Sequence, residues 1–311
     1  MNMLSNNAPK KEPEISPKIT EVAMSKYLTE QQYTNHVLNE LRNVDWVKPL
    51  ISKIATNGDI TNTTNIPLLF EARYAYEIHC RNIQAQYEYK TGVGESTVDF
   101  RCMVEQQEWF IELVSILPSQ AGQQAIHEFI QPGMKLPDGI ETYEQTFDTN
   151  ANNSKMSEEG EILLAEQKIG GKVFANGQPI KFPIPSNAFH VIVADMRGML
   201  GFGGGRSLCH DDYLEIAYGS KRASQREILS RRWPPQNGKP IVGLFEKDNP
   251  FQSAKYIQER IHFIDFVCEG KYEEGEIIQN TFGVENPFLF PKNINEAGIA
   301  RSSHPLFYKE I

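Results

Sequence analysis

Cysteine is scarce in this chain, which has four cysteines among 311 residues, and no two of them stand at Cys-x-x-Cys spacing. We therefore expect free, mostly buried thiols in a reducing compartment, with no disulfide scaffold. The first 18 residues contain no apolar segment of the kind a secretory signal needs. No apolar run approaches the about 20 residues that span a bilayer. These absences predict a soluble, cytoplasmic protein with no membrane partner.

Basic residues are outnumbered, with 31 Lys and Arg against 40 Asp and Glu, so the net charge is −9. This balance gives no global attraction to nucleic acid or to an anionic membrane, although it permits a local basic groove. One local exception is the predicted basic helix over residues 221–233. A solvated helix face is its simplest interpretation, and it is also the best candidate for contacts to a DNA backbone. Its basic residues are Lys221, Arg222, Arg226, Arg231 and Arg232.

Several well-known catalytic motifs are missing. The seven histidines form no i, i+4 pair, which argues against a zinc site. No Gly-x-Ser-x-Gly elbow is present for a serine hydrolase. The glycine-rich stretch at residues 199–207 lacks the Gly-Lys-Ser/Thr of a phosphate-binding loop, so we interpret it as a flexible loop.

The order of the predicted elements indicates an α/β fold. Residues 1–18 are polar and rich in Pro, Lys and Glu, and we expect them to be disordered. Residues 19–58 carry a helical pattern and form an N-terminal appendage, a candidate surface for recognition or for a homodimer. Residues 59–311 form the main domain. Its predicted elements are helices over 66–82 and 156–173, a hairpin over 96–116, and strands over 87–90, 189–200, 240–248 and 260–269. Together they predict a mixed central sheet flanked by helices.

The hairpin raises a chemical question because Asp99 and Glu112 interrupt its apolar runs. A buried carboxylate is costly unless something pairs with it. Side chains alternate along a strand, so any even-length turn places both acids on one face. A turn centred between Gln106 and Gln107 makes them diagonal neighbours, and a turn one residue earlier places them directly opposite. An odd-length turn would separate them.

Two converging carboxylates suit Mg²⁺, which takes oxygen ligands and keeps several waters. A metal held in this way can activate water and stabilise charge on a phosphoryl oxygen. The structural alternative is an ion pair between Asp99 and Arg101 or Arg73, with Glu112 at a solvated sheet edge.

The chain resembles the PD-(D/E)xK nuclease superfamily over about residues 66–200. The resemblance rests on the stretches FEARYAYEI, VDF and WFIELVS, then a lysine-bearing helix and FHVIVADMRG. It implies a restriction-endonuclease-like core and a nuclease that hydrolyses DNA phosphodiester bonds with Mg²⁺ or Mn²⁺, RNA being the alternative substrate. It also implies that Asp99 and Glu112 hold the metal and that Glu71 joins them from its helix.

One departure concerns the lysine that the superfamily places two residues after the second acid, where this chain has Val114. Some members carry that lysine on the following helix, which here offers Lys168 and Lys172. They share a helix face unless Gly170 and Gly171 end the helix between them. Both lysines stay open as catalytic residues, with Gln167 as a third polar candidate.

Val114 also motivates a second hypothesis: a catalytically decayed member of the fold that serves as a nucleic-acid-binding or protein-interaction module. A third hypothesis is an unrelated α/β protein whose hairpin acids are salt-bridged.

Overall fold

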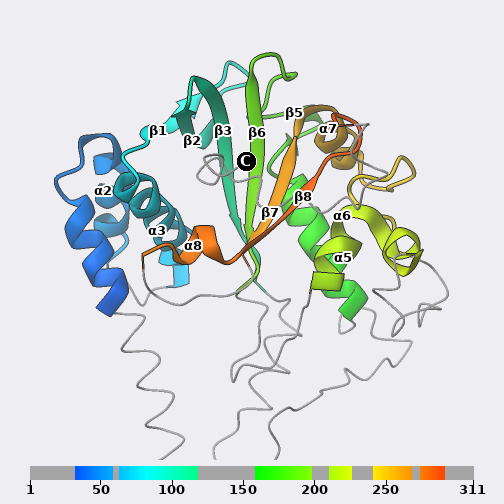
Figure 1. Cartoon of the computed structure of the whole chain (residues 1–311), viewed down its shortest axis with the longest axis horizontal. Helices are drawn as coiled ribbons and strands as arrows, with labels where there is room; N and C mark the ends of the chain where they lie inside the picture. Colours follow the sequence, from blue (N-terminus) through cyan, green and yellow to red (C-terminus); the bar gives the residue numbers. More distant parts are fainter. Residues whose placement is uncertain are drawn as a thin grey trace, which may run out of the picture.

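The computed structural model describes residues 32–58, 63–117, 158–197, 210–225, 241–267 and 274–290. Its centre is a six-stranded sheet with the strand order β1-β2-β3-β6-β7-β8 (Figure 1). β3, β6 and β7 run parallel, and the outer pairs are antiparallel. The strands are β1 (Gln84–Lys90), β2 (Thr97–Val104), β3 (Gln107–Ser115), β6 (Ala188–Asp195), β7 (Phe263–Val267) and β8 (Thr281–Glu285). The prediction of an α/β fold with a mixed sheet is confirmed.

Helices flank the sheet on both sides (Figure 1). One group consists of a helix over residues 32–41, η1 (Asp45–Val47), α2 (Lys48–Thr56), η2 (Thr63–Asn65), α3 (Ile66–Cys80) and α8 (Glu276–Gln279). The other group consists of α5 (Glu158–Gly170), α6 (His210–Gln225) and α7 (Gln252–Arg260). A small ribbon of β4 (Phe174–Ala175) and β5 (Gln178–Pro179) follows α5. No helix among the described residues is long and apolar enough to cross a bilayer.

The core consists of two hydrophobic clusters, one on each face of the sheet. β7 is buried along its whole length, as expected of a strand covered on both faces. The helix over 32–41 and α2 contribute Val37, Leu41 and Leu50 to the same cluster as Tyr74 of α3 and Phe100 of β2. Residues 32–56 therefore pack directly against the sheet layer and α3. The tail over residues 1–18 lies outside the described residues.

The hairpin between β2 and β3 has a two-residue turn. Glu105 and Gln106 form it with φ angles of 50° and 71°, the left-handed pair that a tight type I′ turn requires. Phe100 of β2 pairs with Ile111 of β3. Continued by one step along both strands, this register places Asp99 opposite Glu112. Of the two even-length registers, the structure has the one that places the acids directly opposite.

The expected strand over residues 240–248 is wrong for its described part, residues 241–248, which form turns. Two of their backbone N–H groups bond to α6 just before its kink at Gly219. Leu244 N–H donates to Ile216 O at 2.9 Å and Phe245 N–H to Ala217 O at 2.8 Å. The approach is so close that a Cβ on Gly243 would lie 2.3 Å from Gly219 N. The apolar residues of this segment are thus buried in the same cluster as the middle of α6.

Candidate active site

Glu112 is the centre of the site. It lies on β3, its side chain is 0% exposed, and its neighbours Phe110 and Val114 belong to the cluster under α5. Its Oε1 accepts hydrogen bonds from Lys172 Nζ at 2.7 Å and from Lys181 Nζ at 2.5 Å. Its Oε2 is buried and has no partner among the described residues. One oxygen of the carboxylate therefore accepts hydrogen bonds from two ammonium groups, and the other accepts none within the described part of the chain.

Asp99 lies at a break in the regular structure of β2. The backbone N–H of Leu113 donates to Asp99 Oδ2 at 2.6 Å, so a side chain binds a backbone donor of β3. Val98 and Phe100 belong to different hydrophobic clusters, although residues two apart in a regular strand share a face. Glu88, opposite Asp99 on β1, has a φ of 53°. The strand twists at Asp99, which directs its carboxylate toward β3.

Glu71 joins the two hairpin acids from α3. Tyr87 on β1 donates its hydroxyl hydrogen to Glu71 Oε2 at 2.6 Å. Burial raises the pKa of Glu71, and the charge of Glu112 raises it further. Burial likewise raises the pKa of Asp99 well above its usual range, reinforced by repulsion from Glu112 and Glu71 and opposed by Lys172 and Lys181. The three carboxylates therefore lie close enough for the charge of Glu112 to raise the pKa of both Glu71 and Asp99.

The two lysines differ in how the chain presents them. Lys172 follows the end of α5, where Gly170 packs so tightly against α7 that a Cβ would lie 2.2 Å from Ser253 Oγ. Burial alone would lower the pKa of Lys172, but the attraction of Glu112 and Asp99 outweighs it and raises that pKa. Lys168 turns away and donates to Leu117 O at 2.8 Å. Gln167 has an exposed side chain.

Lys181 is the site residue that sequence reasoning missed. It adopts the left-handed conformation, with a φ of 64°, which is uncommon for any residue but glycine. Two hydroxyl groups of the β1–β2 connection hold its backbone. Lys181 N–H donates to Ser96 Oγ at 3.2 Å, and Thr91 Oγ1 donates to Lys181 O. Lys181 and Glu112 stand 69 positions apart, so no local spacing in the sequence relates them.

The basic residues predicted to contact nucleic acid can be placed only in part. Lys221 and Arg222 lie in the last turns of α6, and their side chains lie outside the described residues. Arg226, Arg231 and Arg232 lie outside the described residues altogether.

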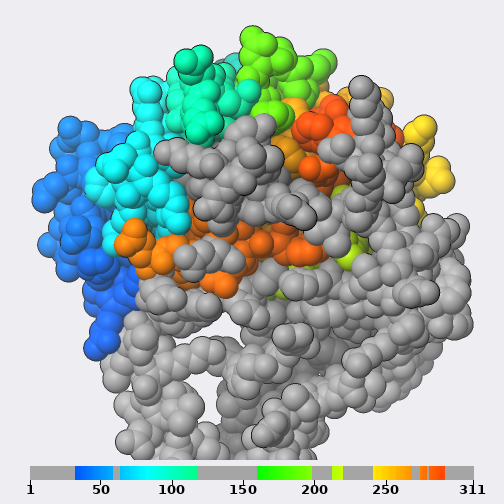
Figure 2. Space-filling model, viewed as in Figure 1, coloured from blue at the N-terminus to red at the C-terminus, as the bar shows by residue number. Residues whose placement is uncertain are grey.

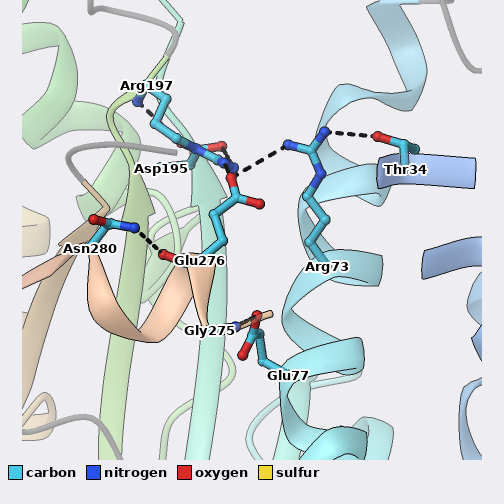
Figure 3. Close-up of polar contacts among 8 residues, drawn as sticks. All are labelled: Thr34, Arg73, Glu77, Asp195, Arg197, Gly275, Glu276 and Asn280. Carbon is cyan, nitrogen blue, oxygen red and sulfur yellow. Dashed lines mark hydrogen bonds and ion pairs between the residues drawn. The ribbon is translucent and has the colours of Figure 1, made fainter. Parts of the chain in front are cut away.

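A second buried charge network lies where α3, α8 and the end of β6 meet (Figure 3). Arg197 bonds to Asp195 and to Glu276, whose other arginine neighbour is Arg73 at 4.0 Å. Arg73 also donates to Thr34 Oγ1 at 2.8 Å, which ties the helix over 32–41 into the network. Because its charges are paired and its members come from four segments, we interpret this network as one that holds those segments together.

Within the described ranges, no group of three or more His, Cys, Asp or Glu side chains is arranged to hold a metal ion. Glu112 Oε2 is nevertheless an unpartnered buried acceptor close to Asp99 and Glu71, and carboxylate oxygens are the ligand type that Mg²⁺ takes. No protein-family model, curated protein or solved structure matches the chain. The arrangement of these residues therefore carries the functional interpretation alone.

Proposed function

We propose that the protein is a metal-dependent nuclease that hydrolyses phosphodiester bonds in DNA at the site formed by Asp99, Glu112 and Glu71. The observation that carries this proposal is the unpartnered Oε2 of Glu112, beside Asp99 and opposite two lysines on the other oxygen. An isolated buried carboxylate oxygen is costly, and a bound cation would satisfy it. The overall order of helix, hairpin, helix and parallel strand also suits the restriction-endonuclease-like fold.

In this proposal Asp99 and Glu112 hold Mg²⁺ or Mn²⁺. The bound ion would lower the pKa of an attached water and withdraw charge from a phosphoryl oxygen. During hydrolysis the water oxygen forms a bond to phosphorus, and the bond from phosphorus to the leaving oxygen breaks. Glu71, whose pKa is raised, is suited to accept the proton that the water loses.

Lys172 and Lys181 together replace the lysine that Val114 displaces from the expected position. Both ammonium groups lie within hydrogen-bond distance of Glu112 in a largely buried setting. Charge stabilisation is strongest where water is excluded, so these groups would stabilise the negative charge that develops on the phosphoryl oxygens. The hydrogen bonds of Ser96 and Thr91 hold Lys181 ready for this role.

The direct experiment is cleavage of plasmid and linear DNA by the full chain with Mg²⁺ or Mn²⁺, and with EDTA as the metal-free control. We expect metal-dependent cutting that Glu112→Gln abolishes, because the amide cannot supply the same negative ligand. Absence of cutting by a folded wild-type protein with both ions would contradict the proposal.

A second candidate function is favoured by the same ion pairs. Lys172 and Lys181 already neutralise one oxygen of Glu112, as salt-bridged residues of a decayed site would. Such a protein would bind nucleic acid without cutting it. Binding of DNA by the wild-type chain that is unchanged by Mg²⁺ and accompanied by no cleavage would favour this function over the nuclease.

A further inference from the structure

A stack of flat side chains crosses the sheet beside the candidate site. The ring of Tyr89 on β1 stacks on Phe110 of β3 with centroids 5.5 Å apart and an interplanar angle of 29°. Phe110 stacks in turn on His190 of β6, at 5.3 Å and 19°. The guanidinium of Arg101 on β2 completes the row, with its central carbon 4.7 Å from the centre of the Tyr89 ring.

The guanidinium of Arg101 is held by its edges. Its Nε donates to Glu108 Oε1, and its Nη1 donates to Gln86 Oε1 at 2.9 Å. These partners come from the strands on either side of β2, so the planar group is fixed and not free to rotate. About a third of the Arg101 side chain remains exposed (31%). One face lies over Tyr89, two nitrogens are engaged, and no second ring contacts Arg101 within the described ranges, which leaves the other face of the guanidinium for a ligand.

The position of this stack relates it to the proposed chemistry. Arg101 is two residues after Asp99 on β2, and Phe110 is two residues before Glu112 on β3. Two residues of strand span about 7 Å, so the stack lies one side-chain step from the acids. In the space-filling view the hairpin and the chain preceding β6 lie side by side at the top of the molecule (Figure 2), where Gln107 donates to Asn187 O.

A guanidinium presented in this way recognises a flat ring better than a phosphate. Binding a phosphate uses the N–H fork, and here Nε and Nη1 are already occupied. Guanidinium faces stack on planar π-systems, and proteins that bind single strands use aromatic and arginine faces to stack nucleobases. In a duplex each base is already stacked between its neighbours, and extracting it costs a few kcal/mol.

We infer that the Arg101–Tyr89 stack binds an unpaired nucleobase next to the scissile phosphate. The favoured substrate is then a single strand, an overhang or a flap rather than intact duplex. This inference rests on the proposed function and narrows its substrate class. The shared chemistry is an unpaired base, which both DNA and RNA can supply.

The test is binding by the full chain in EDTA, where metal-dependent cutting stops. The probes are a 12-nucleotide single-stranded DNA, the same sequence as RNA, and a blunt duplex, each carrying a fluorescent base analogue whose emission reports stacking. We expect tighter binding of a single strand than of the duplex, with quenched emission. Arg101→Lys keeps the charge but loses the plane, and we expect it to weaken single-strand binding about tenfold. Tyr89→Leu should act similarly, whereas Tyr89→Phe, which keeps the ring, should bind as wild type.

The outcomes separate this inference from the proposed function. Equal binding of single strand and duplex, or wild-type binding by a folded Arg101→Lys variant, overturns the stacking inference. If that variant binds the single strand as wild type does, while metal-dependent cutting is still lost in Glu112→Gln, the nuclease proposal stands without the stacking inference. If the chain binds none of the three probes and cuts no DNA, both fail. Folding of each variant is checked by its thermal unfolding midpoint.

Discussion

Leu113 donates its backbone N–H to Asp99 Oδ2 at 2.6 Å, so a side chain of one strand occupies a backbone donor of the next. This bond fixes the Asp99 carboxylate beside β3, where Glu112 and Glu71 raise its pKa by repulsion in addition to burial. The arrangement places the carboxylates of Asp99, Glu112 and Glu71 close together, which is electrostatically unfavourable. Such a cost is typical of a site kept for function and not for stability.

Asp99→Asn should separate these two effects. The amide oxygen can still accept the Leu113 N–H, while the negative charge that repels Glu112 and Glu71 is gone. We expect a folded variant of equal or greater stability, by up to about 1 kcal/mol, that no longer cuts DNA. Urea unfolding and a cleavage assay on the same preparation check this. A variant markedly less stable than wild type would mean that the charge of Asp99 holds the fold together.

Lys172 and Lys168 provide a matched pair. Lys172 contacts Glu112, whereas Lys168 donates to the Leu117 carbonyl. Lys172→Ala should lower the Mg²⁺-dependent cleavage rate about 100-fold, the usual cost of removing one charge-stabilising donor. Lys168→Ala should stay within a few-fold of wild type. Cleavage rates measured at saturating DNA distinguish the two lysines. An equal loss of rate in both variants would mean that Lys168 takes part in the chemistry as well.

Glu276 should matter for stability and not for cleavage. Its buried carboxylate bonds to Arg197 and lies near Arg73, so Glu276→Gln leaves buried arginine charge less well compensated. We expect a loss of about 3–5 kcal/mol in the free energy of unfolding. The exposed pair of Lys48 and Asp45 serves as control, and Asp45→Asn should produce no measurable change. A Glu276→Gln variant as stable as wild type would show that the network contributes little to folding.

The buried histidines should make stability fall with acid. Burial lowers the pKa of His262 to about 4 and that of His190 to about 3. His262 Nδ1 accepts the backbone N–H of His190 at 3.0 Å, which a proton on that nitrogen would prevent. Below about pH 6.5 the unfolded chain binds protons that the folded chain refuses until about pH 4. Stability is therefore lost across that window, by up to about 1.4 kcal/mol per pH unit for each histidine.

His262→Asn isolates this effect, because the amide oxygen can accept the same hydrogen bond without titrating. Carboxyl groups with raised pKa values, such as Asp99 and Glu166, act in the opposite direction, so the comparison must be with the variant. The urea midpoint should fall between pH 7 and pH 5, and this fall should be smaller in His262→Asn than in wild type. An identical fall in both would assign the acid sensitivity to other groups.

Much of the fold follows from patterns that are visible in the sequence. The apolar run of β6, the hairpin and α3 with Pro67 in its first turn all have strong local signatures. α7 has only a weak sequence signature because its buried face consists of Ala254 and Ile257. The segment over 241–248 has strand-like composition, but its backbone hydrogen bonds go to α6, a tertiary preference that local pattern does not encode.

The part of the site that the sequence predicts is the pair of carboxylates that interrupts apolar strands. Asp99 and Glu112 stand out because carboxylates rarely interrupt apolar strands. The choice between Lys168 and Lys172 depends on where α5 ends, and helix ends are poorly determined by sequence. Lys181 reaches Glu112 through a left-handed backbone held by Ser96 and Thr91. Only the three-dimensional structure brings those segments together.

The central claim is that Asp99 and Glu112 form a divalent metal site, and calorimetric titration of the full chain with Mn²⁺ tests it most directly. We expect saturable binding by the wild-type protein that is lost in Glu112→Gln. Because that substitution also removes the charged partner of Lys172 and Lys181, the variant is titrated well below its own unfolding midpoint. Wild-type protein that is folded and binds no Mn²⁺, or a Glu112→Gln variant that binds it as well as wild type, would contradict the claim.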